Sequence, residues 1–107
     1  MSEQSEVVRP LLDALHARAI YARRVMSGRV KVRGGWVHGA PAGTPDIYGF
    51  FGDGRGFVVE CKKSHGDACK CPSCTAQRST RRDLEQRKVL YVFARSVPEA
   101  LASLGLA

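Results

Sequence analysis

The stretch GTPDIYGFFGDGRGFVVECKK, from Gly43 to Lys63, decides the predicted fold. Two apolar runs, DIYGFF and GFVVEC, flank the turn sequence GDGR, a pattern typical of a β-hairpin. Residues that alternate along a strand share a face, so Glu60 and Lys62 point to one side and Cys61 to the other. An acid on the partner run, Asp46, faces the same side only in one register of the hairpin.

The register depends on the length of the turn. A three-residue loop centred on Asp53 sets Asp46 opposite Glu60, whereas a two-residue turn at Asp53-Gly54 sets Asp46 opposite Cys61. We favour the first register, because directly opposed residues on one face approach to about 4.5–5.5 Å at Cβ and can act together.

Two facing carboxylates repel, and a divalent cation between them removes that cost. Asp46 and Glu60 are therefore predicted ligands of Mg²⁺, which usually takes one or two carboxylates together with waters and substrate phosphate. Lys62 beside them is predicted to hold a phosphate oxygen or to orient the attacking water. Such a group of side chains is suited to the hydrolysis of phosphodiesters.

The segments around the hairpin predict one α/β domain with a mixed sheet, in the order α-β-β-β-α-β-α. The glycine-rich segment before the hairpin is expected to form a loop or a hairpin of its own, with short strands at 30–32 and 36–38. Pro10 is expected to loosen the first helix. The other expected elements are a helix capped by Ser5 and running to about Arg18, a strand at 19–25, a helix at 75–88, a strand at 90–94, and a last helix behind a Ser96–Glu99 capping box.

The charge of the 107-residue chain is strongly positive, with 17 Lys and Arg against 10 Asp and Glu and a net charge of +7. This excess favours polyanionic partners, nucleic acid first. The chain has no apolar run of the roughly 18 residues that span a bilayer, and its first residues do not resemble a signal peptide. We therefore expect a cytoplasmic protein with no membrane partner.

The cysteines of an intracellular protein are read as core thiols or metal ligands before disulfides. Cys71-x-x-Cys74 has the spacing of half a zinc site. Because Cys61 is expected to face the core, the predicted structural zinc site combines His65, Cys69, Cys71 and Cys74. A disulfide among the last three residues and free thiols are the alternatives.

Pro45-Asp46 followed by Glu60-Cys61-Lys62 resembles the PD-(D/E)xK nuclease signature, and within that superfamily the chain resembles the VRR-NUC family of small nucleases. The resemblance extends in order over nearly the whole chain, through the segments SEVVRPLLDAL, ARRVMSG, AGTPDI, Gln77 and FARSVPEAL. The chain departs from the family at Val8, where a glutamine is usual, at Lys88-Val89, where a glycine is missing, and in a cysteine-rich insertion at about 64–75.

This resemblance implies a single restriction-endonuclease-like domain over 1–107, a mixed sheet flanked by helices, and a requirement for Mg²⁺ or Mn²⁺. It implies a homodimer that acts on DNA, often branched, flapped or in Holliday junctions. The compactness of the chain favours a bacterial or phage-infected cell as its location. The implied catalytic residues are Asp46, Glu60, Lys62 and Gln77, and the implied metal ligands are Glu6, Asp46, Glu60 and the backbone carbonyl of Cys61.

Basic residues on both sides of the predicted site are expected to bind phosphates, in a way that is independent of sequence and sensitive to salt. The alternative is that they form solvated surfaces. The candidates are Arg24, Arg29, Lys31, Lys63, Arg78, Arg81 and Arg82.

The leading hypothesis is a metal-dependent, structure-specific endonuclease that hydrolyses DNA phosphodiester bonds. The alternatives are a non-catalytic, zinc-stabilised nucleic-acid-binding module and a nuclease that acts on RNA.

Overall fold

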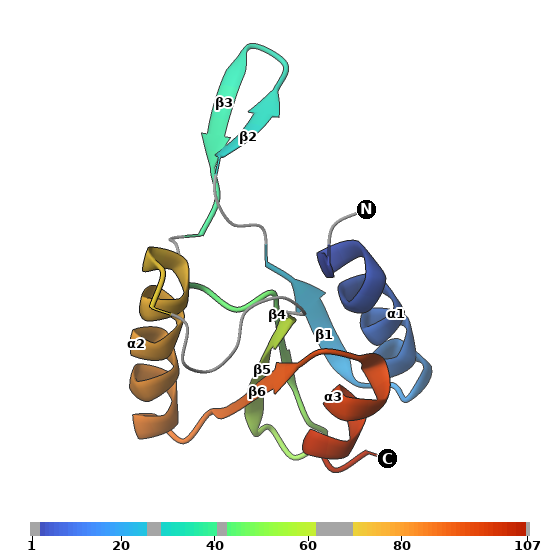
Figure 1. Ribbon diagram of the computed structural model, residues 1–107. Coiled ribbons are helices and arrows are strands. Elements are labelled where there is room, and N and C mark those ends of the chain that lie inside the picture. The colour runs from blue at the N-terminus through green and yellow to red at the C-terminus, as the bar shows by residue number, and fades with distance from the viewer. Residues whose placement is uncertain (1–2, 26–28, 41–42, 62–69, 107) are drawn as a thin grey trace.

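The computed structural model describes residues 3–25, 29–40, 43–61 and 70–106. Within these ranges the chain forms three helices and six strands (Figure 1). In chain order they are α1 (Glu3–Ala17), β1 (Tyr21–Arg24), β2 (Arg29–Val32), β3 (Gly35–His38), β4 (Ile47–Phe50), β5 (Gly56–Cys61), α2 (Pro72–Gln86), β6 (Leu90–Ala94) and α3 (Val97–Ser103).

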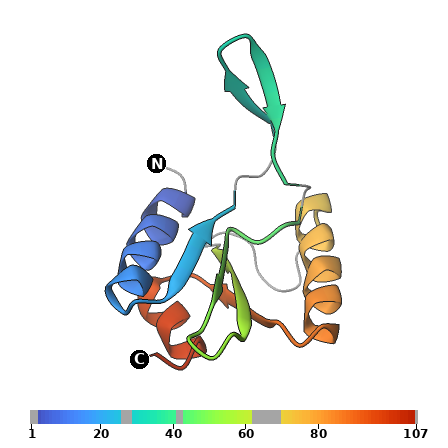
Figure 2. The same ribbon diagram turned by 180° about the vertical axis from the view of Figure 1, so that it is seen from behind.

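The main sheet has four strands in the order β1-β4-β5-β6. The first three strands pair antiparallel, while β6 pairs parallel to β5 after the chain crosses over through α2. Figures 1 and 2 show α1 and α3 on one face of this sheet and α2 on the other. The predicted mixed α/β architecture is therefore confirmed, and the predicted element order holds for this sheet and its helices.

The hydrophobic core lies between the sheet and the helices α1 and α3, on what we call the core face. Apolar residues at helical spacing in α1, chiefly Val8, Leu11 and Leu15, pack against alternate residues of the central strands. Phe57, Val59 and Cys61 of β5 point into this core, as the alternation along the strand predicts. Glu60 therefore points to the opposite face, where α2 lies; we call it the site face.

The turn between β4 and β5 has the predicted length. Ile47 pairs with Val59 and Phe50 with Gly56, and the Phe51 N–H donates to the Arg55 carbonyl at 2.9 Å. The three-residue loop Gly52–Gly54 closes the hairpin, with Gly54 at a φ of 90°. Backbone and side-chain hydrogen bonds from Arg55 hold the pKa of the Asp53 carboxyl below its ordinary value.

The glycine-rich segment forms a hairpin, one of the two predicted possibilities. Strands β2 and β3 pair only with each other among the described strands, as a separate two-stranded sheet. Figures 1 and 2 show this hairpin extending away from the main sheet. The strands on either side of it, β1 and β4, are direct neighbours, and the Val25 N–H donates to the Asp46 carbonyl at 2.7 Å.

Two predicted helix starts are wrong. Helix α1 begins at Glu3, so Ser5 lies inside it rather than capping it, and the helix continues through Pro10. Helix α2 begins at Pro72 rather than at residue 75, because the Sγ of Cys71 accepts a hydrogen bond from the Cys74 N–H at 3.4 Å and caps the helix. No helix in the described ranges is both long and apolar enough to cross a bilayer.

Candidate functional site

Two buried acids form the centre of the site. One step beyond the Ile47–Val59 pair, the register of β4 and β5 sets Asp46 opposite Glu60. Their exposed fractions are 6% for Asp46 and 3% for Glu60, and they are the two buried charged residues in the described part of the chain. Acidic side chains are rarely buried without a specific partner or function, so this pair is the strongest candidate for a functional site.

Asp46 is held by the backbone of β5. Its Oδ2 accepts a hydrogen bond from the Cys61 N–H at 2.8 Å. The N–H and C=O of a strand residue point to the same side, so the Cys61 carbonyl is also directed toward β4. That orientation agrees with the predicted role of this carbonyl as a metal ligand, which stays a prediction.

The two acids also affect a neighbouring thiol. Burial raises the pKa of the Cys61 thiol to about 12, and the negative charges of Asp46 and Glu60 contribute. Cys61 is therefore a neutral core residue at physiological pH, as expected from its place on the strand.

Helix α2 supplies the third polar group of the site. The Gln77 Nε2 donates a hydrogen bond to Glu60 Oε1 at 3.0 Å, while the other Glu60 oxygen, Oε2, is buried. The Tyr91 hydroxyl lies on the same face, and its pKa is raised, first by burial and then by the charge of Glu60. Gln77 was predicted from the family resemblance alone, and the structure places its amide on one of the two acids.

A glycine sets the distance between α2 and the segment that leads into Asp46. Gly43 has a φ of 90°, and a Cβ added there would lie 2.7 Å from the Ala76 carbonyl carbon. No other residue type allows this approach without displacement. Gly43 therefore holds the segment before Asp46 against the helical turn that carries Gln77.

The donor atoms fit a hard divalent cation. Asp46 and Glu60 offer carboxylate oxygens, the ligands preferred by Mg²⁺ and Mn²⁺, and a carboxylate that accepts one hydrogen bond keeps further lone pairs. The described residues contain no group of three or more His, Cys, Asp or Glu side chains that could hold a metal ion. A cation bound here would depend on these two acids, backbone oxygen and water.

Several predicted site residues lie outside the described ranges, namely Lys62, Lys63, His65 and Cys69. The backbones of Glu6, Arg29 and Lys31 lie in α1 and β2, and their side chains are outside the described part of the chain. The predicted roles of these residues stay predictions.

Half of the predicted zinc site lies at the start of α2. Cys71 is half-buried and Cys74 is buried, and no disulfide joins the described cysteines Cys61, Cys71 and Cys74. Cys71 and Cys74 lie one helical turn apart, as the two ligands of a Cys-x-x-Cys half-site do. The zinc site stays a prediction, because His65 and Cys69 lie outside the described ranges.

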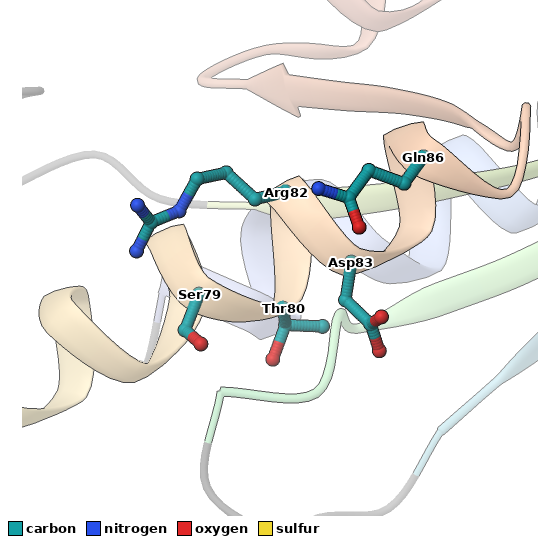
Figure 3. Close-up of a pocket in the computed structure, with 5 residues that line it drawn as sticks. All are labelled: Ser79, Thr80, Arg82, Asp83 and Gln86. Carbon is teal, nitrogen blue, oxygen red and sulfur yellow. The ribbon is translucent and has the colours of Figure 1, made fainter.

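The basic residues of α2 lie on different parts of the helix. Arg81 covers the Tyr91 ring, with its guanidinium carbon 5.5 Å from the ring centroid, and also pairs with Glu85. Arg82 lies in a shallow hollow of about 430 Å³ on α2 (Figure 3). The described residues that line this hollow are Ser79, Thr80, Arg82, Asp83 and Gln86, and it does not contain the acid pair.

A group of aromatic residues on the site face was not among the predicted site residues. Tyr21 of β1 and Tyr48 and Phe50 of β4 are exposed, and Arg23 lies among them. The available signal was the alternation in YARR and IYGF, which places Ala22 and Gly49 on the core face and these residues on the other.

Comparison with known proteins identifies no relative: no protein-family model matches the chain, and neither a curated protein nor a solved structure matches it significantly. The assignment of a function therefore depends on the geometry of the site and on the sequence motif.

Proposed function

We propose that this protein is a metal-dependent endonuclease of the PD-(D/E)xK type, with a restriction-endonuclease-like fold, that hydrolyses DNA phosphodiester bonds. The observation that carries the proposal is the pair of buried acids, Asp46 and Glu60, set opposite each other on adjacent strands. The order Pro45-Asp46 and then Glu60-Cys61-Lys62 resembles the PD-(D/E)xK signature.

Each residue of the site has a role in this proposal. Asp46 and Glu60 hold the cation, and the Gln77 amide fixes the Glu60 carboxylate through its hydrogen bond to Oε1. A bound Mg²⁺ or Mn²⁺ supplies Lewis-acid stabilisation of the charge that develops on the phosphate. Lys62 orients the attacking water, whose oxygen forms the new bond to phosphorus as the bond to the leaving sugar oxygen breaks.

The basic character of the chain supports a nucleic-acid substrate. A net charge of +7 attracts the phosphate backbone and would provide binding that does not depend on sequence. The preference for branched, flapped or junction DNA and the homodimer belong to the same proposal and follow from the resemblance to VRR-NUC proteins. Mg²⁺ or Mn²⁺ at the acids and Zn²⁺ at the cysteines are the proposed metals.

A cleavage assay tests the proposal. Branched and linear DNA are incubated with the protein in Mg²⁺, in Mn²⁺ and in EDTA, with Glu60→Gln and Lys62→Ala as site variants. Glu85→Gln is the matched control, because it makes the same chemical change at an exposed acid of α2. Cleavage that needs the metal, is lost in both site variants and is kept in the control supports the nuclease.

Two other outcomes lead to the alternatives. DNA binding without cleavage in any metal supports the non-catalytic binding module, for which the acid pair is a structural feature. Cleavage of RNA but not of DNA of matching sequence supports a ribonuclease with the same site.

A further inference from the structure

The site face of the sheet is covered only in part. Helix α2 contacts β6, and under it Val58 and Tyr91 are buried. On the other half of the same face, three large aromatic residues are exposed: Tyr21 by 48%, Tyr48 by 38% and Phe50 by 49%. A group of exposed aromatic rings in a small protein indicates a binding surface more often than an unused one.

These rings form an ordered surface, which we call the aromatic platform and define as Tyr21, Arg23, Tyr48 and Phe50. Tyr21 pairs with Phe50 across the strands, with their ring centroids 6.2 Å apart, and Arg23 pairs with Tyr48. The Arg23 guanidinium carbon lies 4.2 Å from the centroid of the Tyr21 ring. The platform thus combines flat π-surfaces with a stacked cation.

The platform continues directly into the acid pair. Tyr48 and Asp46 are separated by one residue on the same segment, a rise of roughly 6.6–7 Å along a strand, and their side chains share a face. Across the sheet, the row that contains Tyr48 therefore lies next to the row that contains Asp46 and Glu60. The platform and the acid pair therefore occupy adjacent rows of the same face.

We propose that the aromatic platform binds an unpaired segment of DNA by stacking its bases, and that it presents the adjoining phosphodiester to Asp46 and Glu60. This inference rests on the proposed function. Aromatic rings combined with arginine are the usual means of binding single-stranded nucleic acid, and the net charge of +7 favours a polyanion. In paired DNA the bases are already stacked and the platform has no free base to bind.

A second copy of the chain is the less suitable occupant. Four side chains offer much less than the roughly 800 Å² that each partner of a stable complex buries. A symmetric contact through this surface would also bring Arg23 of each copy toward the same residue of the other copy, in a protein that already carries a large positive charge.

Binding of fluorescent DNA oligonucleotides without added Mg²⁺ or Mn²⁺, which prevents cleavage and leaves the proposed structural zinc in place, tests the proposal. The probes are a single strand, a blunt duplex and a duplex with a single-stranded flap, each measured by anisotropy. Tyr48→Ala and Phe50→Ala are expected to weaken single-strand and flap binding by roughly 5- to 150-fold each, with a smaller effect on the duplex. Tyr48→Phe keeps the ring and should bind as the wild type does. Leu90→Ala is the control: it removes an exposed apolar side chain of β6 outside the platform and should leave binding unchanged.

Arg23→Gln supplies a second, independent readout. It is expected to reduce the salt dependence of single-strand binding by about 0.7 in the slope of log K against log salt, whereas the aromatic variants leave the slope unchanged. Equal loss on duplex and single strand, or no loss in either aromatic variant, would overturn the proposal. Conversion of a dimer to a monomer by Phe50→Ala with unchanged DNA binding would also overturn it.

The platform and the nuclease can fail separately. If Tyr48→Ala and Phe50→Ala selectively lose single-strand binding but the wild-type protein cleaves no DNA, the platform is supported and the nuclease is refuted. If the wild-type protein cleaves DNA and both Tyr48→Ala and Phe50→Ala bind single strands normally, the nuclease is supported and the platform is refuted.

Discussion

The Gln77 side chain of α2 donates a hydrogen bond to Glu60 of β5 at 3.0 Å, across the interface between the crossover helix and the sheet. Because Glu60 also lies opposite Asp46, this amide connects α2 to the acid pair. The position of α2 is therefore coupled to the geometry of the candidate site.

Replacing Gln77 by leucine should weaken metal binding more than folding. The leucine keeps most of the volume but removes the donor that fixes Glu60, and partners of metal ligands typically change metal affinity by about 10–100-fold. We expect the Mg²⁺ concentration for half-maximal cleavage to rise by about that factor. Gln86→Leu is the control, because it makes the same change at an exposed position of α2 (Figure 3), and it should have no effect. If the wild type, Gln77→Leu and Gln86→Leu give identical Mg²⁺ curves, the hydrogen bond does not support the site.

Glu60→Gln should remove the stabilisation that Mg²⁺ gives to the folded protein. A ligand that binds only the native state stabilises it by about 1.4 kcal/mol at ten times its Kd, which corresponds to several degrees in Tm. The wild type should therefore melt at a higher temperature with Mg²⁺ than without added Mg²⁺, and Glu60→Gln should not. A Mg²⁺ effect of the same size in Glu60→Gln would place the cation elsewhere.

Alkaline pH should destabilise the protein partly through Cys61. The thiol in the unfolded chain loses its proton near its ordinary pKa of 9.0, while the folded protein keeps the proton up to about 12. The unfolded state binds fewer protons in this window, so stability falls as pH rises, by up to about 1.4 kcal/mol per pH unit for one group. Urea denaturation should show a shallower pH dependence for Cys61→Ala than for the wild type; parallel curves would contradict the assigned cause.

Gly43→Ala should be strongly destabilising. It adds a Cβ at 2.7 Å from the Ala76 carbonyl carbon and forces a left-handed conformation on a residue that has a Cβ, a combined cost of about 2–5 kcal/mol. Gly54→Ala is the control, because it has the same φ of 90° with nothing within 4 Å, and should cost only about 1–2 kcal/mol. If both variants lose the same unfolding free energy, the close contact between Gly43 and α2 does not contribute to stability.

Purified protein should contain about one structural zinc ion per chain if His65, Cys69, Cys71 and Cys74 form the predicted closed site. Elemental analysis measures the zinc directly, and Cys74→Ser should reduce it. Cys61→Ser is the matched control, because Cys61 points into the core. Two results together would contradict the prediction: the purified protein contains no zinc, and its helical circular dichroism is unchanged by a chelator.

The hairpin was predictable because its signals are local: turn residues around Asp53 lie between two apolar runs. These residues left two registers open, and the one that sets Asp46 opposite Glu60 was favoured because opposed acids can act together; the strand pairing confirms it. The cap of α3 was equally local: Ser96 accepts from the Glu99 N–H at 3.2 Å, as the capping box predicts.

The start of α2 and the aromatic platform were not predictable in the same way. Cysteine is not among the usual capping residues, so Cys71 gives no signal of its own, and the available signal was Pro72 at the first helical position. The exposure of Tyr48 and Phe50 depends on which strands α2 covers, and this is decided by tertiary packing rather than by the pattern of β4. The alternation of IYGF predicts that these rings share a face but not that the face is open.

The β2–β3 hairpin leaves the main sheet after Val25 and the chain returns at Asp46, two positions joined by a backbone hydrogen bond. Since both ends of this excursion meet at one point, the β2–β3 hairpin itself can change in length with little effect on the frame that holds the acids, because loop closure depends only weakly on loop length. Gly43, which packs against α2, is excepted. The hairpin can thus be shortened, lengthened or exchanged while the strands that carry Asp46 and Glu60 keep their pairing.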